Sequence, residues 1–166
     1  MKYLLDANTF MTAARNFYSF DYGTKFWDFL EDQARNDVLA SIDKVLNEIN
    51  KGNDELKNWA NGNFSNYFLS TKSNTIFQKY GELMQWAENQ NNHYTRNAID
   101  EFMKEDNADP WLIAFASKNI DEYIIVTFET SNPNRKNKIP IPNVCEALNI
   151  KYCDLYQMLK DLNFKL

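Results

Sequence analysis

Hydrophobic residues along the chain form two patterns, short continuous runs and longer stretches with helical spacing. The short runs cover residues 3–5, 38–40 and 123–127, and each is too short for a helix and has the composition of a buried strand. Residues 151–153 are a candidate edge strand. Because a chain that starts in a buried strand can wind outward on both sides, we expect the first strand to lie at the centre of a parallel sheet.

The longer stretches predict helices between these strands. Apolar residues recur at helical intervals over residues 7–15, 23–35, 42–50, 54–60, 74–89, 95–104 and 108–117. Two further short helices are expected to start at residues 143 and 154. Regular alternation of strands and helices indicates an α/β fold with a central, mainly parallel sheet, and a length of 166 residues indicates one domain over residues 1–166.

Short polar side chains mark where several helices are expected to begin. Asn8 and Thr9 are candidate caps for the first helix, and Ser41 and Asp54 for the helices that follow them. Asp109 directly precedes Pro110, a combination typical of a helix start, because proline has no N–H to lose in the first turn. The near-continuous apolar sequence after it predicts a helix buried against the sheet.

Composition and charge exclude several classes of protein. No stretch approaches the roughly 20 apolar residues of a membrane span, and the N-terminus lacks the features of a signal peptide, so we expect a cytoplasmic protein with no membrane partner. The net charge of −5 argues against binding nucleic acid through the overall field, although local positive charge can still do so.

Cysteine and histidine offer little for catalysis. Cys145 and Cys153 lack the spacing of a disulfide framework or a zinc site, and we expect buried thiols. The single histidine, His93, lies in a polar stretch and is expected to be a solvated bystander. A Ser-His-Asp or Cys-His mechanism is therefore hard to assemble from this chain.

Carboxylates follow or precede the predicted sheet elements at several points. Asp6 ends the first strand, Glu129 follows the strand at 123–127, Asp109 begins the buried helix, and Glu48 lies on the helix over residues 42–50. The carboxyl ends of parallel strands meet at one edge of a sheet, where ligands bind in open α/β folds. Two carboxylates 5 Å apart repel by about 3 kcal/mol at an effective dielectric constant near 20, so converging acids need a cation or shared protons. Oxygen ligands alone favour Mg²⁺ or Mn²⁺.

Each of these acids also has a structural interpretation. Asp6 can form an Asx-turn or cap a helix, and Asp109 can cap the helix that it begins. Glu48 can be a solvated helix residue, and Glu129 an ordinary loop acid. Only their joint placement favours a functional site.

The loop over residues 130–138 is polar and carries Arg135, Lys136 and Lys138. These side chains could bind phosphate near the carboxylates, or they could simply be solvated. The sequence alone leaves both interpretations open.

Four motifs, in order, resemble those of PIN-domain nucleases: DAN at 6–8 after an apolar strand, SxxxVxxE at 41–48, ADPWLIA at 108–114, and VT followed by an acid at 126–129. The tail KIPIPNVC at 138–145 resembles an uncharacterised bacterial branch whose members are similar to VapC-like toxins. The resemblance implies a three-layer α/β/α PIN-like fold. It also implies an Mg²⁺- or Mn²⁺-dependent endoribonuclease that hydrolyses RNA phosphodiesters, the toxin of a type II toxin–antitoxin system with a protein antitoxin, and a homodimer.

The resemblance also implies roles for individual residues. Asp6, Glu48 and Asp109 match the acids of the family, and Asn8 and Thr127 match polar supports. The usual fourth acid is an aspartate two residues after the threonine, whereas this chain has Glu129 there. Its longer side chain could shift a second metal or bind it through water. In this interpretation all four acids hold the metal, and Arg135 and Lys136 support the substrate.

Two rival functions remain open. A PIN-like fold could bind RNA or a partner protein without cutting, which the change to Glu129 and the acidic composition favour. A haloacid-dehalogenase-like phosphatase would use Asp6 as its nucleophile. Members of that family have a second aspartate two residues later, where this chain has Asn8.

Overall fold

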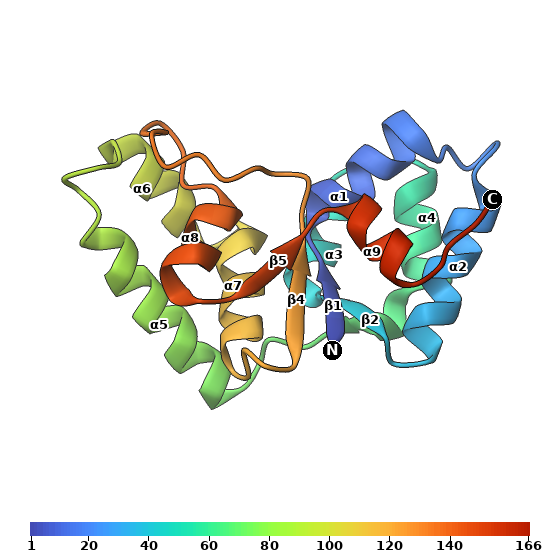
Figure 1. Ribbon diagram of the computed structural model, residues 1–166, viewed down its shortest axis with the longest axis horizontal. Helices are drawn as coiled ribbons and strands as arrows, with labels where there is room; N and C mark the ends of the chain where they lie inside the picture. The colour runs from blue at the N-terminus through green and yellow to red at the C-terminus, as the bar shows by residue number, and fades with distance from the viewer.

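A computed structural model describes residues 1–166 and contains a five-stranded parallel sheet of order β3-β2-β1-β4-β5 (Figure 1). The strands are β1 (Lys2–Leu5), β2 (Leu39–Ile42), β3 (Phe68–Leu69), β4 (Tyr123–Val126) and β5 (Lys151–Cys153). The first strand lies at the centre and the last at an edge, as predicted. The sheet and its flanking helices confirm the predicted α/β class.

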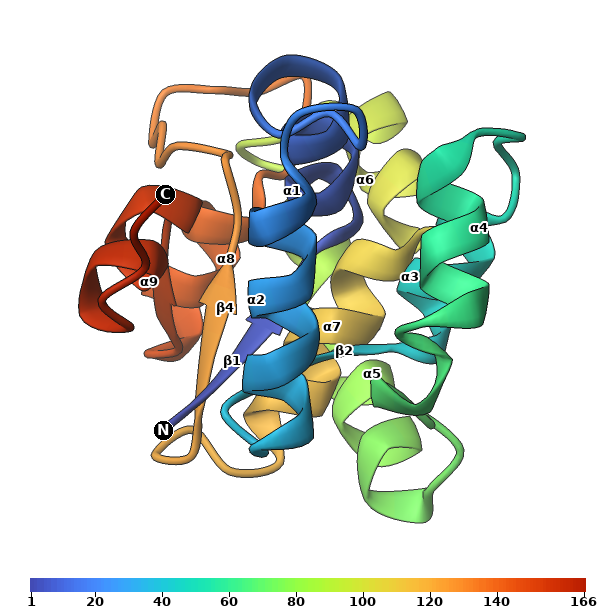
Figure 2. The ribbon, with the colours of Figure 1, turned by 90° about the vertical axis from the view of Figure 1, so that its right-hand side faces the viewer.

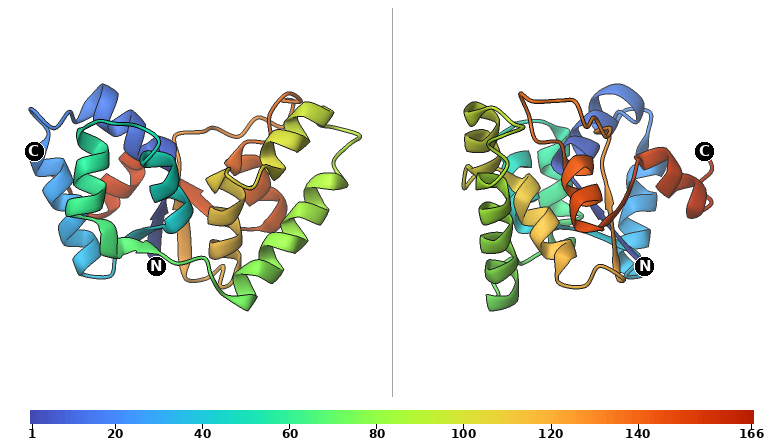
Figure 3. Two further views of the ribbon diagram at one scale, coloured as in Figure 1. Left: turned by 180° about the vertical axis from the view of Figure 1, so that it is seen from behind. Right: turned by 60° about the vertical axis from the view of Figure 1, so that its left-hand side comes forward.

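Helices cover both sides of the sheet. Figure 3 (right) shows α5 and α7 on one side of the strands and α2 and α9 on the other, and Figure 2 shows α2 and α4 on the side facing the viewer. The helices are α1 (Ala7–Thr12), which continues into a π-helical turn (Ala13–Phe17), α2 (Thr24–Arg35), α3 (Asp43–Ile49), α4 (Glu55–Gly62), α5 (Asn74–Glu88), α6 (Arg96–Met103), α7 (Ala108–Ser117), α8 (Ile141–Leu148) and α9 (Leu155–Asp161). No helix is both long and apolar enough to cross a bilayer.

The register of the central strands places their carboxyl ends together. Leu5 at the end of β1 pairs with Val126 at the end of β4, and the backbone N–H of Asp6 donates to the Val126 carbonyl at 3.1 Å. In Figure 1 both strands run upward, so this edge is at the top, where the loop after β4 arches toward α6. The sheet therefore brings Asp6 and the residues after β4 to one edge.

The core is formed by one cluster of buried apolar side chains, and α7 is its most buried helix. Residues 110–116 of α7 are all buried, because the helix packs against β4, α3, α5 and α8. This confirms the buried helix predicted from the apolar sequence after Pro110. A helix fixed on several sides holds its first turn rigidly beside the sheet edge.

Two predicted helix caps are wrong. Ser41 lies inside β2 and donates its hydroxyl to the Leu5 carbonyl at 2.6 Å. Asn8 and Thr9 are the second and third residues of α1, because Asp6 is the residue that caps this helix. In both places the role of the short polar side chain is set by its position at the sheet edge, and helix-capping propensity alone does not reveal that position.

The structure also differs from prediction at strand β3, in the middle of the chain, and at helix α8, toward its C-terminus. The two-residue edge strand β3 follows a short 3₁₀ turn (Ser65–Tyr67) and has too few residues to give a pattern. Helix α8 begins at Ile141 instead of residue 143, with Pro142 in its first turn. Proline is tolerated there because first-turn N–H groups have no partner within the helix.

Two glycines should respond in opposite ways to alanine. A Cβ added at the exposed Gly81 of α5 meets nothing within 4 Å, so Gly81→Ala should stabilise the protein by roughly 0.5–1 kcal/mol. A Cβ at Gly23 would lie 2.7 Å from the Tyr18 Cα, so Gly23→Ala should destabilise it by about 1–3 kcal/mol. Urea unfolding of both variants measures the two changes. Equal effects would contradict the close approach at Gly23.

Candidate active site

Asp6 is a buried carboxylate at the end of the central strand. Its side chain is only 1% exposed. Oδ1 caps α1 by accepting from the Thr9 N–H at 2.7 Å, whereas Oδ2 is buried with no hydrogen-bond partner. The capping interpretation of Asp6 is therefore correct for one oxygen. The other is a bare acceptor, and such groups are rare in folded proteins because they lose hydration without compensation.

One of the two predicted polar supports, Thr127, interacts with this carboxylate. The buried Thr127 hydroxyl interacts with Asp6 and lowers its pKa, and it also accepts from the Glu129 N–H at 3.1 Å. Asn8 is exposed and lines the cleft described below. Neither side chain caps a helix, so each is free to interact with polar groups of the site or with solvent.

Asp109 lies in the first turn of α7 but does not cap it. The cap is Asn107, whose side chain accepts from the Asp109 N–H at 3.1 Å. The expectation that Asp109 itself caps the helix is therefore wrong. Asn107 leaves the Asp109 carboxylate out of the capping interaction, available at the sheet edge.

Glu48 is fixed to the same helix end. Its Oε1 accepts from the Ala108 N–H at 2.9 Å, across 60 residues of sequence. A carboxylate at a helix N-terminus gains from the orphan N–H groups and from the helix dipole. This contact carries Glu48 from α3 to the start of α7, so the solvated-residue interpretation is wrong.

Glu129 has both carboxylate oxygens engaged. Oε1 pairs with the Lys138 ammonium at 3.0 Å, and Oε2 accepts from the Ile141 N–H at 3.0 Å, at the start of α8. Its side chain is 14% exposed. Glu129 is thus an anchored acid, not a mobile loop residue.

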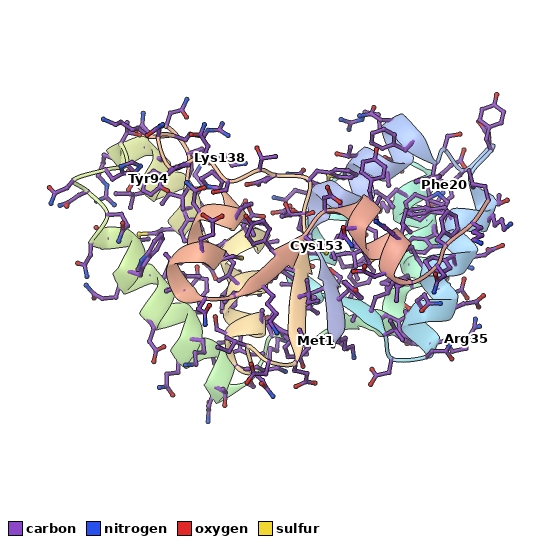
Figure 4. The ribbon with its side chains drawn as sticks, in the orientation of Figure 1. Met1, Phe20, Arg35, Tyr94, Lys138 and Cys153 are labelled. Carbon is purple, nitrogen blue, oxygen red and sulfur yellow. The ribbon has the colours of Figure 1, made fainter.

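An open cleft of about 560 Å³ lies beside these acids. Its wall includes Asn8, Glu48 and Asp109, and four cations from three segments: Lys51 after α3, Lys104 after α6, and Arg135 and Lys138 on the loop before α8. Lys136 does not line the cleft, unlike Arg135 and Lys138 of the same loop. Figure 4 labels Lys138 on the loop that connects β4 to α8.

Electrostatics tie the four acids together. Burial raises the pKa of Asp6 to about 6. Burial also raises the pKa of Asp109 well above its ordinary value, and the negative charges of Glu129, Asp6 and Glu48 add to this rise, in that order. The Lys138 ammonium opposes it. The acids that the sequence places on separate elements therefore converge closely enough to resist ionising together.

The donor set fits a hard cation that keeps much of its water. No three acid, histidine or cysteine side chains form a complete ligand set, so a cage that uses all four acids is not preformed. Mg²⁺ needs only one or two carboxylates and retains several waters. The unpartnered Oδ2 of Asp6 and the uncapped carboxylate of Asp109 match this requirement.

Residues 3–166 match a family described as "Domain of unknown function (DUF4411)". The chain belongs to this family. No curated protein matches the chain. Because the match covers nearly the whole chain, the sheet edge and the cleft both lie within the DUF4411 region.

Solved structures share the fold at low identity. One chain in the crystal structure of VapBC2 from Rickettsia felis, bound to a DNA fragment from their promoter, is similar with a TM-score of 0.53 and 16% identity. The match covers 93% of this chain and 98% of that one. A chain of FitAcB from Neisseria gonorrhoeae gives a TM-score of 0.49 at 13% identity, over 90% and 95% of the two chains. The first of these shows that the DUF4411 chain shares the fold of that VapBC2 chain.

Several cleft residues lie outside the set predicted from sequence. Asn107, Lys104 and Asn137 line the cleft, and α6 forms part of its wall although its apolar spacing indicates only core packing. Lys138 stands out in the basic loop only through its partner, nine residues earlier. No spacing rule signals such a pair, because the loop path brings the two together.

Because Asp6 is buried, the free energy of unfolding should depend on pH when a chelator removes metal ions. The pKa rises from 3.8 to about 6 on folding, so the folded state binds the proton more tightly and stability falls as pH rises through this range, by roughly 3 kcal/mol. Asp6→Asn removes the charge and keeps an oxygen for the Thr9 N–H. Its melting temperature should exceed that of the wild type at pH 7.5, with the gap closing toward pH 4.

Thermal unfolding in EDTA between pH 4 and pH 8 measures this effect. Asp28→Asn, an exposed change on α2, is the matched control and should follow the wild type at every pH. A constant gap between Asp6→Asn and the wild type would contradict the assignment of the effect to Asp6 ionisation.

Proposed function

We propose that this protein is an Mg²⁺- or Mn²⁺-dependent endoribonuclease that hydrolyses RNA phosphodiester bonds and acts in the cytoplasm as the toxin of a type II toxin–antitoxin pair. The observation that carries the proposal is the bare Oδ2 of Asp6, buried at the sheet edge where Asp109, Glu48 and Glu129 also act on one another. An unpartnered buried carboxylate among like charges is costly unless a cation binds there.

In the proposed mechanism the chain's own groups position metal and substrate. Asp6 Oδ2 and the Asp109 carboxylate hold the cation, which when bound supplies a polarised water and offsets charge on the phosphate. Glu48, fixed by the Ala108 N–H, would orient that water. The Thr127 hydroxyl lowers the pKa of Asp6 and so favours the ionised carboxylate that would bind the cation.

The cleft wall provides contacts for RNA phosphates. Arg135 lines the cleft, and its Nε donates to the Asn137 side chain at 3.1 Å, with no carboxylate partner for the guanidinium. By contrast, Lys51 pairs with Asp106 and Lys104 pairs with Glu101. Arg135 is therefore the cleft cation most available to a phosphate, and the exposed amide of Asn8 adds a neutral donor.

The fold shared with a chain of VapBC2 supports the first of two proposed protein partners. They are a protein antitoxin and a second copy of this chain. The connection after α1 carries two exposed aromatic side chains, Phe17 and Tyr22, and is a candidate contact for the antitoxin.

A second function, RNA or protein binding without cleavage, is favoured by two observations. Glu129 is already neutralised by Lys138 and the Ile141 N–H, and no three ligands form a complete set. Cleavage assays separate the two functions, because both predict RNA binding and only the nuclease predicts new RNA ends.

Removing either central carboxylate should abolish cleavage. A panel of tRNA and mRNA substrates is incubated with wild type, Asp6→Asn and Asp109→Asn in Mn²⁺ or in EDTA. Each variant should lose activity by more than the roughly 100-fold typical of losing an outer-shell group of a metal site, because each removes one of the two carboxylates proposed to hold the ion. EDTA should abolish RNA cleavage by the wild type.

Asp28→Asn controls for the loss of one negative charge and should cleave normally. A phosphomonoester tested beside the RNA covers the phosphatase alternative. Full RNA cleavage by Asp6→Asn would contradict the nuclease mechanism, and phosphomonoester turnover without RNA cleavage would support the phosphatase.

The toxin role makes a separate prediction. Induced expression in a bacterial host should reduce colony formation by the wild type and not by Asp6→Asn at equal protein level, because toxicity then depends on the cleaving site. Colony counts with immunoblots measure this. A wild type that cleaves RNA in vitro but does not slow growth would argue against a toxin while leaving the nuclease intact.

A further inference from the structure

Lys138 forms a fixed positive charge inside the cleft. Its ammonium lies 3.0 Å from Oε1 of Glu129, and its side chain is 42% exposed, so one side of the group is held by the protein while the other faces the cleft. Figure 4 shows Lys138 on the loop between β4 and α8. The lysine is anchored at its tip instead of moving freely like most surface lysines.

The anchor itself is rigid. Glu129 is mostly buried, its second oxygen accepts from the Ile141 N–H at the start of α8, and its own N–H donates to the buried Thr127 hydroxyl. A carboxylate with a charged donor on one oxygen and a helix N-terminus on the other gains from both charge-assisted hydrogen bonds. Releasing Glu129 to bind a metal ion would break both contacts.

The position of Lys138 relates it to the other acids. Lys138 and Asp109 line the same cleft, and Glu129 follows β4 at the edge where Asp6 ends β1. Asp6 and Glu129 do not line the cleft themselves, and the acids at this sheet edge form two corners of different charge. The corner of Asp6 and Asp109 has uncompensated negative charge, and the corner of Glu129 already has a cation of its own.

We propose that Lys138 is the resident cation of the Glu129 corner, where it binds a phosphate of the RNA directly and limits the site to one divalent ion, held at the corner of Asp6 and Asp109. This inference rests on the proposed function for the identity of the ligand as RNA. It goes beyond that function by assigning a substrate-binding role to Lys138 and a stoichiometry to the metal.

The first test counts metal ions without any cleavage. Calorimetric titration of the wild type with Mn²⁺ should give one ion per chain. Lys138→Met removes a nearby positive charge and should tighten Mn²⁺ binding by at least roughly threefold. Lys136→Met is the matched control, because it makes the same change two residues away outside the cleft, and it should leave the affinity unchanged.

The second test measures phosphate contact directly. A fluorescent single-stranded RNA oligonucleotide is titrated in EDTA at several salt concentrations. Lys138→Met should weaken binding and reduce the slope of log affinity against log salt by about 0.7, the value for one phosphate on a single strand. Lys138→Arg should restore the slope, and Lys136→Met should not change it.

The outcomes separate this inference from the proposed function. Two Mn²⁺ ions per wild-type chain, or a Lys138→Met slope equal to that of Lys136→Met, would overturn the role of Lys138 even if the protein cleaves RNA. One ion together with a reduced slope would support Lys138 even if cleavage assays show no activity, in which case only the nuclease fails.

Discussion

The central constraint on this structure is the cost of placing several carboxylates at one edge of a parallel sheet. Asp6 is almost fully buried and leaves one oxygen without a partner, and Asp109 feels the negative charge of three neighbouring acids. Such an arrangement opposes folding unless a proton or a cation compensates it. The elements around the edge divide these acids into those whose charge the protein offsets itself and those whose charge it leaves uncompensated.

Helix N-termini provide much of that division. Glu48 accepts from the first N–H of α7, Glu129 from that of α8, and Oδ1 of Asp6 from an N–H of α1. Each contact satisfies an orphan amide and gains from the helix dipole. Asn107 caps α7 in place of Asp109, so the carboxylate with the most unfavourable surroundings is left outside these contacts. A single acidic side chain can therefore have a structural role and a functional role at the same time.

The sequence predicts the main strands and the long helices because each carries its own hydrophobic period. The central strand, the strand before Thr127 and the buried helix after Pro110 are examples. The edge strand β3 has two residues and no period, so it could not be predicted. Ser41 shows another limit: its composition fits a cap, but its hydroxyl bonds to the Leu5 carbonyl on the next strand, and only the sheet pairing reveals that.

The candidate site was predictable as a set of acids, not as a set of contacts. Motif order identifies Asp6, Glu48 and Asp109, but the contacts that fix them depend on long-range packing. The basic residues of the site were harder to predict. Lys136 and Lys138 look equivalent in the sequence of a polar loop, but only Lys138 lines the cleft. The difference arises because the chain turns back at Ile141, where Glu129 caps the next helix and brings the loop with it.

Glutamate at position 129 has a physical explanation in this geometry. One carboxylate must reach the Ile141 N–H and the Lys138 ammonium at the same time, both at 3.0 Å, and the additional methylene of glutamate extends its reach beyond that of aspartate. With both oxygens engaged, Glu129 has part of its negative charge offset by Lys138, although among the neighbouring acids it still raises the pKa of Asp109 the most. The electrostatic demand for a cation is therefore concentrated at Asp6 and Asp109, on the central strand and the most buried helix, where the backbone is held most rigidly.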